Sequence, residues 1–115
     1  MSKMKFRAKY KDNDRWSVFT LQEILEKDRE MFDNYHNWGQ YTEGKDKNNK
    51  EIYEGDIVKG YLTLVNNDVY DFQDVIEYHH YSFECPNNAD FPLDQYDELE
   101  IIGNIYENPE LIKWK

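Results

Sequence analysis

Apolar and polar residues alternate at the start of the chain. Between residues 3 and 10, four apolar or aromatic side chains alternate with four basic ones, and a period of two is typical of a strand with one buried and one wet face. Residues 11–15 have turn composition, so the pattern predicts a second short strand at about residues 16–19. The basic side chains then lie on the solvent face of the first strand.

The pattern changes to a helical period after these strands. Apolar residues recur three and four positions apart, and Thr20 with Glu23 fits a capping box, in which each side chain accepts a hydrogen bond from the other residue's backbone N–H. This predicts an amphipathic helix at about residues 21–31. The residues that follow, up to Gly39, have no period and contain loop-forming types.

From residue 40 onward the chain consists of short apolar segments separated by turns. Turns are predicted at residues 46–49, 54–56 and 66–68, and strands at about residues 57–65, 69–72, 75–83 and 99–106. Strands at this spacing favour a small antiparallel barrel or sandwich. The expected fold is therefore α+β: an N-terminal part at 1–39 with strands at 3–10 and 16–19 and a helix at 21–31, then a mostly antiparallel barrel at 40–115, together one compact unit.

Composition supports a folded domain. The 115 residues include 33% charged positions, and a mean hydropathy of -1.02 would by itself suggest partial disorder. Three Trp, ten Tyr and six Phe oppose that conclusion, because large rings build cores and interfaces. A chain of this length forms one core of ordinary size, which excludes a multi-domain enzyme.

Charge is distributed unevenly along the chain. The net charge is -10, yet residues 1–15 hold six basic residues against two acids, while residues 60–112 hold twelve acids and neither Lys nor Arg. Phosphate-backbone binding needs clustered Lys and Arg, so nucleic acid is an unfavoured partner. The acidic half either serves solubility or offers a surface to a basic partner.

Two blocks of sequence carry a resemblance to a known family. Residues 40–58, QYTEGKDKNNKEIYEGDIV, and residues 101–111, IIGNIYENPEL, together with KFRAKY at 5–10, resemble the YopX family of phage and prophage proteins in Gram-positive bacteria. At the turn Asn49 stands where the family usually has glycine, and Asn tolerates the left-handed conformation. The motif residues, interpreted as structural, are Tyr53, Glu54, Gly55, Asp56, Gly103, Asn104, Tyr106, Asn108 and Pro109.

The resemblance implies a C-terminal SH3-like barrel joined to a smaller N-terminal α+β part. It implies no catalytic residues, because the family is functionally uncharacterised. The glycines and β-branched residues of the motifs are of the kind that build turns, bulges and buried strands. The chain is therefore expected to be a non-enzymatic phage protein that acts through protein contacts.

One cluster could carry chemistry. Glu77 and His79 share a strand face and, with Cys85, could ligate Zn²⁺, but no second Cys or His lies at ligand spacing. A Cys85 thiolate activated by His80 would need an oxyanion hole that nothing in the sequence supplies. We therefore expect neither a metal nor a cofactor, and interpret this segment as a mixed polar and aromatic surface.

The aromatic residues of the acidic half form the candidate interaction surface: Tyr61, Tyr70, Phe72, Tyr78, His79, Tyr81 and Phe83. Surplus rings favour a homo-oligomer or a host or phage protein as partner, with the basic first strand meeting the acidic half within or between chains. The alternatives are a small barrel that binds nucleic acid and an acidic mimic that occupies a host protein's nucleic-acid site. A single cysteine and no membrane-length apolar run indicate a reducing cytoplasm and no membrane partner. The family resemblance implies that this cytoplasm is that of a bacterial host.

Overall fold

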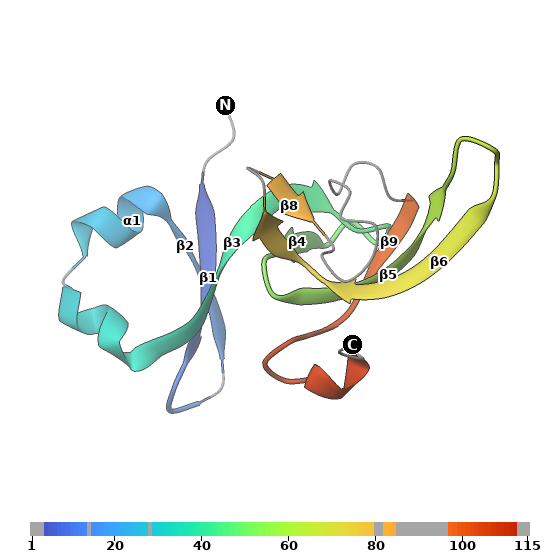
Figure 1. Cartoon of the computed structure of the whole chain (residues 1–115). Coiled ribbons are helices and arrows are strands. Elements are labelled where there is room, and N and C mark those ends of the chain that lie inside the picture. The colour runs from blue at the N-terminus through green and yellow to red at the C-terminus, as the bar shows by residue number, and fades with distance from the viewer. Residues whose placement is uncertain (1–3, 14, 28, 80–81, 85–96, 113–115) are drawn as a thin grey trace. The chain divides into compact units, whose positions relative to one another are not determined.

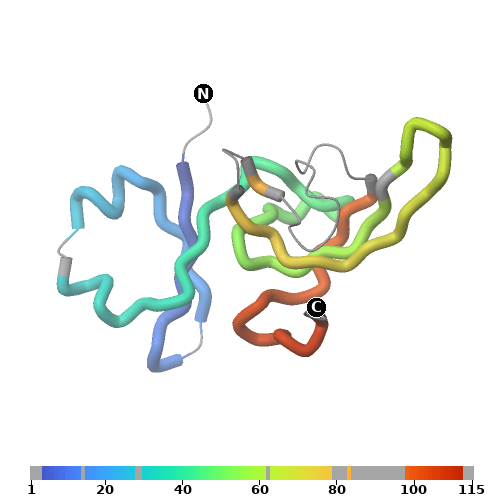
Figure 2. Tube along the Cα trace, viewed as in Figure 1, coloured from blue at the N-terminus to red at the C-terminus, as the bar shows by residue number. Residues whose placement is uncertain are grey.

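The computed structural model describes residues 4–13, 15–27, 29–79, 82–84 and 97–112 (Figure 1). The chain divides into two compact units, Met1–Tyr41 and Thr42–Lys115. Strand β3 (Tyr35–Lys45) begins in the first unit and ends in the second, as the tube in Figure 2 shows. Each unit is described by itself below.

The first unit is a three-stranded antiparallel arrangement. Strand β1 (Lys5–Tyr10) pairs with β2 (Trp16–Thr20) on one side and with β3 on the other. Ala8 is completely buried and Phe19 is 7% exposed. The Phe19 ring packs edge-on against Phe32, with centroids 5.4 Å apart, so aromatic contacts fill the space beside the sheet.

The helical segment of this unit is shorter than predicted. Helix α1 (Leu21–Glu26) begins with the expected capping box: the Glu23 N–H donates to Thr20 Oγ1 at 3.1 Å, and the Thr20 N–H donates to Glu23 Oε1 at 3.0 Å. The helix nevertheless ends before Lys27, and a 3-10 helix η1 (Arg29–Asn34) follows. Leu25 is 76% exposed, so the apolar stripe is not buried, and a continuous helix gains little from packing.

The second unit contains the remaining strands. In chain order these are β4 (Glu51–Tyr53), β5 (Asp56–Thr63), β6 (Val69–Val75), β7 (Glu77–His79), β8 (Ser82–Glu84) and β9 (Asp97–Asn104). Strands β7 and β8 form a separate short ribbon, and the 3-10 helix η3 (Pro109–Leu111) follows β9. The sheet order is β6-β5-β9, and β4 lies beside β3. All the pairings in the β6-β5-β9 sheet and the β7-β8 ribbon are antiparallel.

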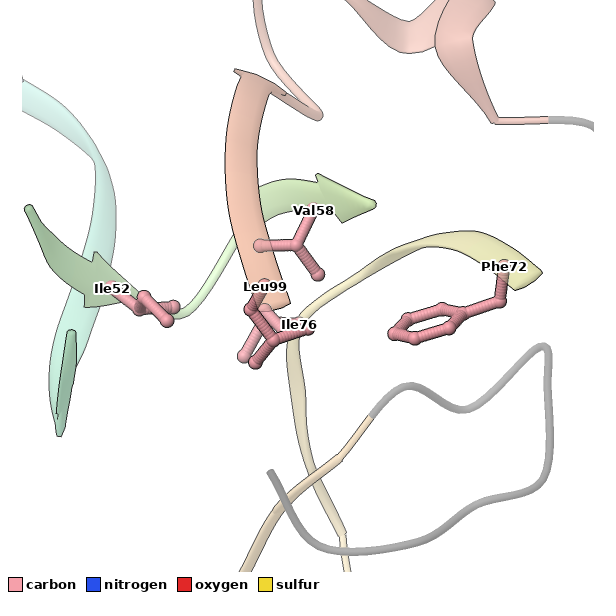
Figure 3. Packing of buried hydrophobic residues seen from close by; sticks show 5 residues of the cluster. All are labelled: Ile52, Val58, Phe72, Ile76 and Leu99. Carbon is pink, nitrogen blue, oxygen red and sulfur yellow. The ribbon is translucent and has the colours of Figure 1, made fainter. Parts of the chain in front are cut away.

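Aliphatic side chains fill two clusters in the second unit. One contains Ile52, Val58, Phe72, Ile76 and Leu99, which Figure 3 shows drawn together from four strands and the segment after β6. The other contains Ile57, Val75 and Ile112. Because Ile57 and Val58 are adjacent on β5, their side chains point to opposite faces, so the sheet is covered on both sides at this end.

The predicted fold class is wrong. The described residues are mainly strands in antiparallel pairings, with one α-helix of six residues among them, so an α+β class with an SH3-like barrel does not apply. A barrel closes when its terminal strands pair, whereas β6 and β9 remain the two edges of the three-stranded sheet. Turn spacing along a sequence predicts strands but not which edges join.

Candidate functional site

The first motif forms the turn between β4 and β5. Asp56 is 2% exposed, and its Oδ2 accepts a hydrogen bond from the Tyr53 N–H at 2.8 Å. Gly55 has a φ of +93°, a conformation that side chains disfavour. Its N–H donates to the Ile76 carbonyl at 2.9 Å, and its own carbonyl accepts from the Ile105 N–H at 2.9 Å. The turn is thus fixed from three directions.

The second motif meets the first. Asp56 lies opposite Asn104 in the β5-β9 register, and a Cβ on Gly55 would lie 3.2 Å from the Tyr106 ring. A Cβ on Gly103 would come within 2.6 Å of Asn108 Oδ1, the atom that accepts the Asn104 N–H at 3.3 Å. The two motifs therefore make one structural junction, with Glu54 half-buried in the turn and Pro109 opening η3.

Asp46 is a buried acid whose role the sequence did not reveal. It is 6% exposed, and its carboxylate accepts backbone hydrogen bonds from Asn48 and Lys50 at 2.9 Å and from Ile101 at 3.1 Å. Burial raises the pKa of Asp46, but the three backbone donors outweigh it and hold the pKa below its usual value. Asp46 therefore ties the β3-β4 turn to β9.

The predicted aromatic surface is divided by the structure. Phe72 is 8% exposed and belongs to the core, while Phe83 is half-buried against that core. Tyr61 lies opposite Asp71 and Tyr70 opposite Leu62, so the two tyrosines point to opposite faces of the sheet. Tyr78 is 52% exposed and its ring lies edge-on to Phe83 at 5.1 Å.

The remaining candidate residues lie mostly outside the described part. His79 belongs to β7, where it shares a strand face with Glu77, but its side chain is not described, and His80, Tyr81 and Cys85 fall outside the described residues. Among the side chains that are described, no group of three potential metal ligands occurs.

A cluster of exposed apolar side chains marks the β5-β6 hairpin. Leu64 is 42% exposed, Val69 61% and Tyr70 52%, while Val65 at the turn is fully exposed. We call these four residues the hairpin tip. In Figure 1 the hairpin extends away from the rest of its sheet. Single exposed apolar residues are common on surfaces, but four occur here within seven positions. Val69 and Tyr70 are consecutive on β6 and lie on opposite faces of the hairpin, so the end of the hairpin presents apolar side chains on both faces and at the turn.

The turn that carries the tip is held by its own hydrogen bonds. The Leu64 N–H donates to the Asp68 carbonyl and the Asn67 N–H to the Leu64 carbonyl, both at 2.8 Å. Asn67 has a φ of +70°, as a bulged hairpin turn requires. Asn66 and Asp68 add side-chain hydrogen bonds across the turn, so the backbone that carries the apolar residues is held in one turn conformation.

A shallow depression of about 550 Å³ lies on the sheet of the second unit. Its lining includes Lys47, Lys59, Tyr61, Asp71, Gln73 and Glu98. Lys59 lies 3.3 Å and Lys47 3.7 Å from Glu100 Oε1. The hydrogen bond from Lys59 lowers the pKa of Glu100, which keeps this carboxylate charged.

The basic strand uses its cations within the first unit. Lys5, Arg7 and Lys9 alternate along β1 and so share one face of the sheet. Lys5 lies over the Tyr41 ring at 4.6 Å, and Arg7 and Lys9 lie over the Trp16 ring at 4.8 and 5.8 Å. The predicted wet basic face is thus a cation-π layer.

In the part that the structure describes, no helix is long and apolar enough to cross a membrane.

The chain was compared with protein families and with curated proteins. The family model described as YopX protein matches residues 2–113. No curated protein matches the chain.

Proposed function

The chain belongs to the YopX family, and we propose that it is a non-enzymatic module that binds another protein through the hairpin tip. The observation that carries this proposal is the exposed apolar side chains of Leu64, Val65, Val69 and Tyr70 on a turn held by its own hydrogen bonds. Burial of large apolar side chains provides most of the free energy of protein association.

Pre-organisation of the turn supports binding. A flexible loop loses conformational entropy when it is ordered in a complex, at about 1 to 2 kcal/mol for each residue whose backbone becomes fixed. The hydrogen bonds of Asn66, Asn67 and Asp68 fix the backbone before any partner arrives. The tip therefore lowers the entropic cost of binding.

The roles of the buried acids support a non-enzymatic function. Asp46 and Asp56 accept backbone N–H groups of their own unit, so both carboxylates serve the fold. The partner proposed is a host or phage protein in the bacterial cytoplasm, or a second copy of this chain. If the partner is a basic nucleic-acid-binding protein, the module acts as an acidic mimic.

Site-specific cross-linking tests the tip. A photoreactive benzoylphenylalanine at Val65, in cells that encode the protein, should give one discrete adduct, whose second component is identified by mass spectrometry. The matched control places the same group at Asn48, an exposed residue of another hairpin turn in the same unit. A smear of adducts, or equal adducts from both positions, would contradict the proposal.

Self-association has a separate measurement. If the partner is a second copy, sedimentation velocity of the purified protein should show a concentration-dependent increase in mass that Val65→Asp removes. A salt series then shows whether the opposite charges of the two halves contribute, because exposed charge pairs weaken with ionic strength. A monomer at every concentration removes the homo-oligomer from the possible partners.

Nucleic-acid binding is the second candidate, favoured by the layer of three cations and two rings on the first unit. Single-stranded nucleic acids bind such combinations of charge and aromatic rings. The net charge of -10 opposes this candidate. Fluorescence anisotropy at low salt decides: binding that weakens steeply with salt, and is lost when Lys5, Arg7 and Lys9 are changed to Glu, would replace the first proposal.

A further inference from the structure

In the part of the chain that the structure describes, strand β6 has a neighbouring strand along one of its two edges only. It lies at the border of the three-stranded sheet and pairs with β5 on one side. The Leu64 N–H donates to the Asp68 carbonyl at one end of the hairpin, and the Ile76 N–H donates to the Asp56 carbonyl at the other. Positions bonded across the pair recur at every second residue of an antiparallel ladder. By the β5-β6 register, Val69, Asp71 and Gln73 therefore direct their N–H and C=O groups away from β5. These three residues define the β6 edge.

The β6 edge lacks a hydrogen-bonding partner among the described residues over a limited length. Beyond Gln73 the next outward N–H belongs to Val75, and it donates to Asp74 Oδ1 at 2.7 Å, an acceptor on a completely buried side chain. Within the described residues, no further backbone hydrogen bond reaches the outward groups of Val69, Asp71 or Gln73. An added strand of about five residues would satisfy these groups.

The side chains beside the edge define what such a strand must carry. Asp71 is exposed and lines the depression, and no described Lys or Arg lies within ion-pair distance of it, because Lys47 and Lys59 are directed to Glu100. On the opposite face Tyr70 is 52% exposed. An added strand therefore gains from a cation opposite Asp71 and from apolar side chains on the Tyr70 face.

A second copy of the chain fits this edge poorly. Two β6 strands paired symmetrically about Asp71 would set like charges opposite each other, which is destabilising. The basic strand β1 has β2 and β3 on its two sides, so it has no free edge to offer. The twelve acids and absent Lys and Arg of residues 60–112 likewise favour a basic partner over another acidic unit.

We propose that the β6 edge binds an extended segment of a partner protein by strand addition, with a Lys or Arg of that segment opposite Asp71. Backbone hydrogen bonds to the three edge residues then supply affinity, and the charge pair with Asp71 supplies selectivity. This inference rests on the proposed function, because it states how the module would hold the protein that the hairpin tip contacts.

Two synthetic peptides test the edge directly. Ac-TTVKVTT-NH2 and Ac-TTVEVTT-NH2 differ only in the central charge. Added at millimolar concentration to the full chain, the Lys peptide should slow amide hydrogen exchange at Val69, Asp71 and Gln73 and bind about fivefold tighter than the Glu peptide, the ratio expected of one cross-strand charge pair. The absence of protection at these amides overturns the proposal.

Three variants at position 71 distinguish the contribution of the backbone N–H to peptide binding from that of the side-chain charge. Asp71→Pro removes the outward N–H and keeps the hydrogen bonds to β5, so it should abolish binding of both peptides. Asp71→Asn keeps the N–H and should remove the preference for Lys, and Asp71→Lys should reverse it. Unchanged binding by Asp71→Pro, with circular dichroism showing a folded chain, overturns strand addition.

The outcomes for the edge and the tip are distinguishable. A Val65 cross-link that persists in Asp71→Pro supports the tip and overturns the edge as the place where that partner is held. Protection of the edge by the Lys peptide without any Val65 cross-link overturns the proposed use of the tip and supports the edge. A mass increase of the protein alone that Asp71→Pro removes would make the occupant a second copy and overturn the partner named here.

Discussion

The two units are stabilised by different kinds of side chain. In the first, Ala8 and Phe19 are buried, and the packing beside the sheet consists of ring contacts such as Phe32 with Trp38 at 5.6 Å. In the second, two clusters of mainly aliphatic residues are buried around the sheet. Aliphatic cores lose free energy sharply when a side chain is truncated, whereas half-buried rings can adjust.

The charged groups also differ between the two units, in their sign and in how deeply they are buried. The cations of β1 lie over ring faces at the surface of the first unit. The buried acids Asp46, Asp56 and Asp74 all belong to the second, where Asp46 and Asp56 accept backbone N–H groups. A buried acceptor that satisfies backbone donors is costly to remove, whereas a half-buried cation that lies over a ring face costs less. The second unit should therefore be the more sensitive to mutation.

Truncation of the aliphatic core should have the largest effect. Ile76 is completely buried in the cluster with Ile52 and Val58, so Ile76→Ala should lower the free energy of unfolding by about 2 to 5 kcal/mol. Urea denaturation followed by circular dichroism measures it. Val65→Ala, at the fully exposed tip, is the control and should change it by less than about 0.5 kcal/mol. A similar small loss from both would end the contrast in packing.

Removal of a buried acceptor should have the next largest effect. Asp46→Ala leaves three backbone N–H groups without their carboxylate, at a cost of about 1.5 to 3 kcal/mol. Asp33→Ala, at an exposed residue of the first unit, is the matched control and should be close to neutral. Equal losses of unfolding free energy from the two variants would show that the buried acid of the second unit contributes no more to stability than the exposed acid of the first.

The same carboxylate gives a pH dependence of known direction. Because folding lowers the pKa of Asp46 from its ordinary value of 3.8, its contribution is complete above that value and is lost as pH falls through it towards the folded pKa. The stability advantage of the wild type over Asp46→Asn should therefore shrink between pH 7 and pH 3. An advantage that is constant over this range contradicts the role assigned to Asp46.

The sequence predicted the features that depend on neighbouring residues better than those that depend on residues far apart in the chain. Alternation located β1, and the local pair Thr20 and Glu23 located the start of α1. The end of α1 was missed because Met31 and Phe32 continue a helical period while lying in a 3-10 helix that sets Phe32 against Phe19. Strand edges and barrel closure depend on pairings between distant segments, which periodicity does not contain.

The candidate site shows the same limit. Asp46 was recognised as a turn residue, but its bond to Ile101 spans 55 positions and has no local signal. Phe72 was predicted to lie on the interaction surface because it belongs to the aromatic residues of the acidic half. In the structure Phe72 lies opposite Gly60 in the β5-β6 pairing, and its ring packs in the core. The hairpin tip is exposed because the paired strands β5 and β6 are long enough to carry it away from the core. The pairing of the two strands is not contained in the prediction of either strand alone.

Close packing at the motif junction predicts a smaller but specific effect. In Gly103→Ala the new Cβ would lie within 2.6 Å of Asn108 Oδ1, and overpacking of this kind costs about 1 to 3 kcal/mol. Asn108→Ala removes the nearest atoms, so the double variant should lose less than the sum of the single variants in urea denaturation. Strict additivity would show that a side chain at position 103 does not contact Asn108 within the second motif.

The smallest expected effect lies in the first unit and tests the other side of the comparison. Arg7 lies over the Trp16 ring at 4.8 Å, and its Nε is buried. The pair should therefore contribute more than the roughly 0.5 kcal/mol of a fully exposed cation-π pair and less than the roughly 2 kcal/mol of a desolvated one. A double-mutant cycle of Arg7→Gln and Trp16→Leu should give a coupling energy of that size, measured by urea denaturation.

The matched cycle uses Lys9 in place of Arg7. Lys9 lies farther from the same ring, at 5.8 Å, so Lys9→Gln should couple to Trp16→Leu more weakly. A coupling above about 2 kcal/mol for Arg7 would mean that the pair is desolvated and that the cation layer stabilises the first unit as a core does. The contrast between a unit held by its surface rings and a unit held by its interior would then fail.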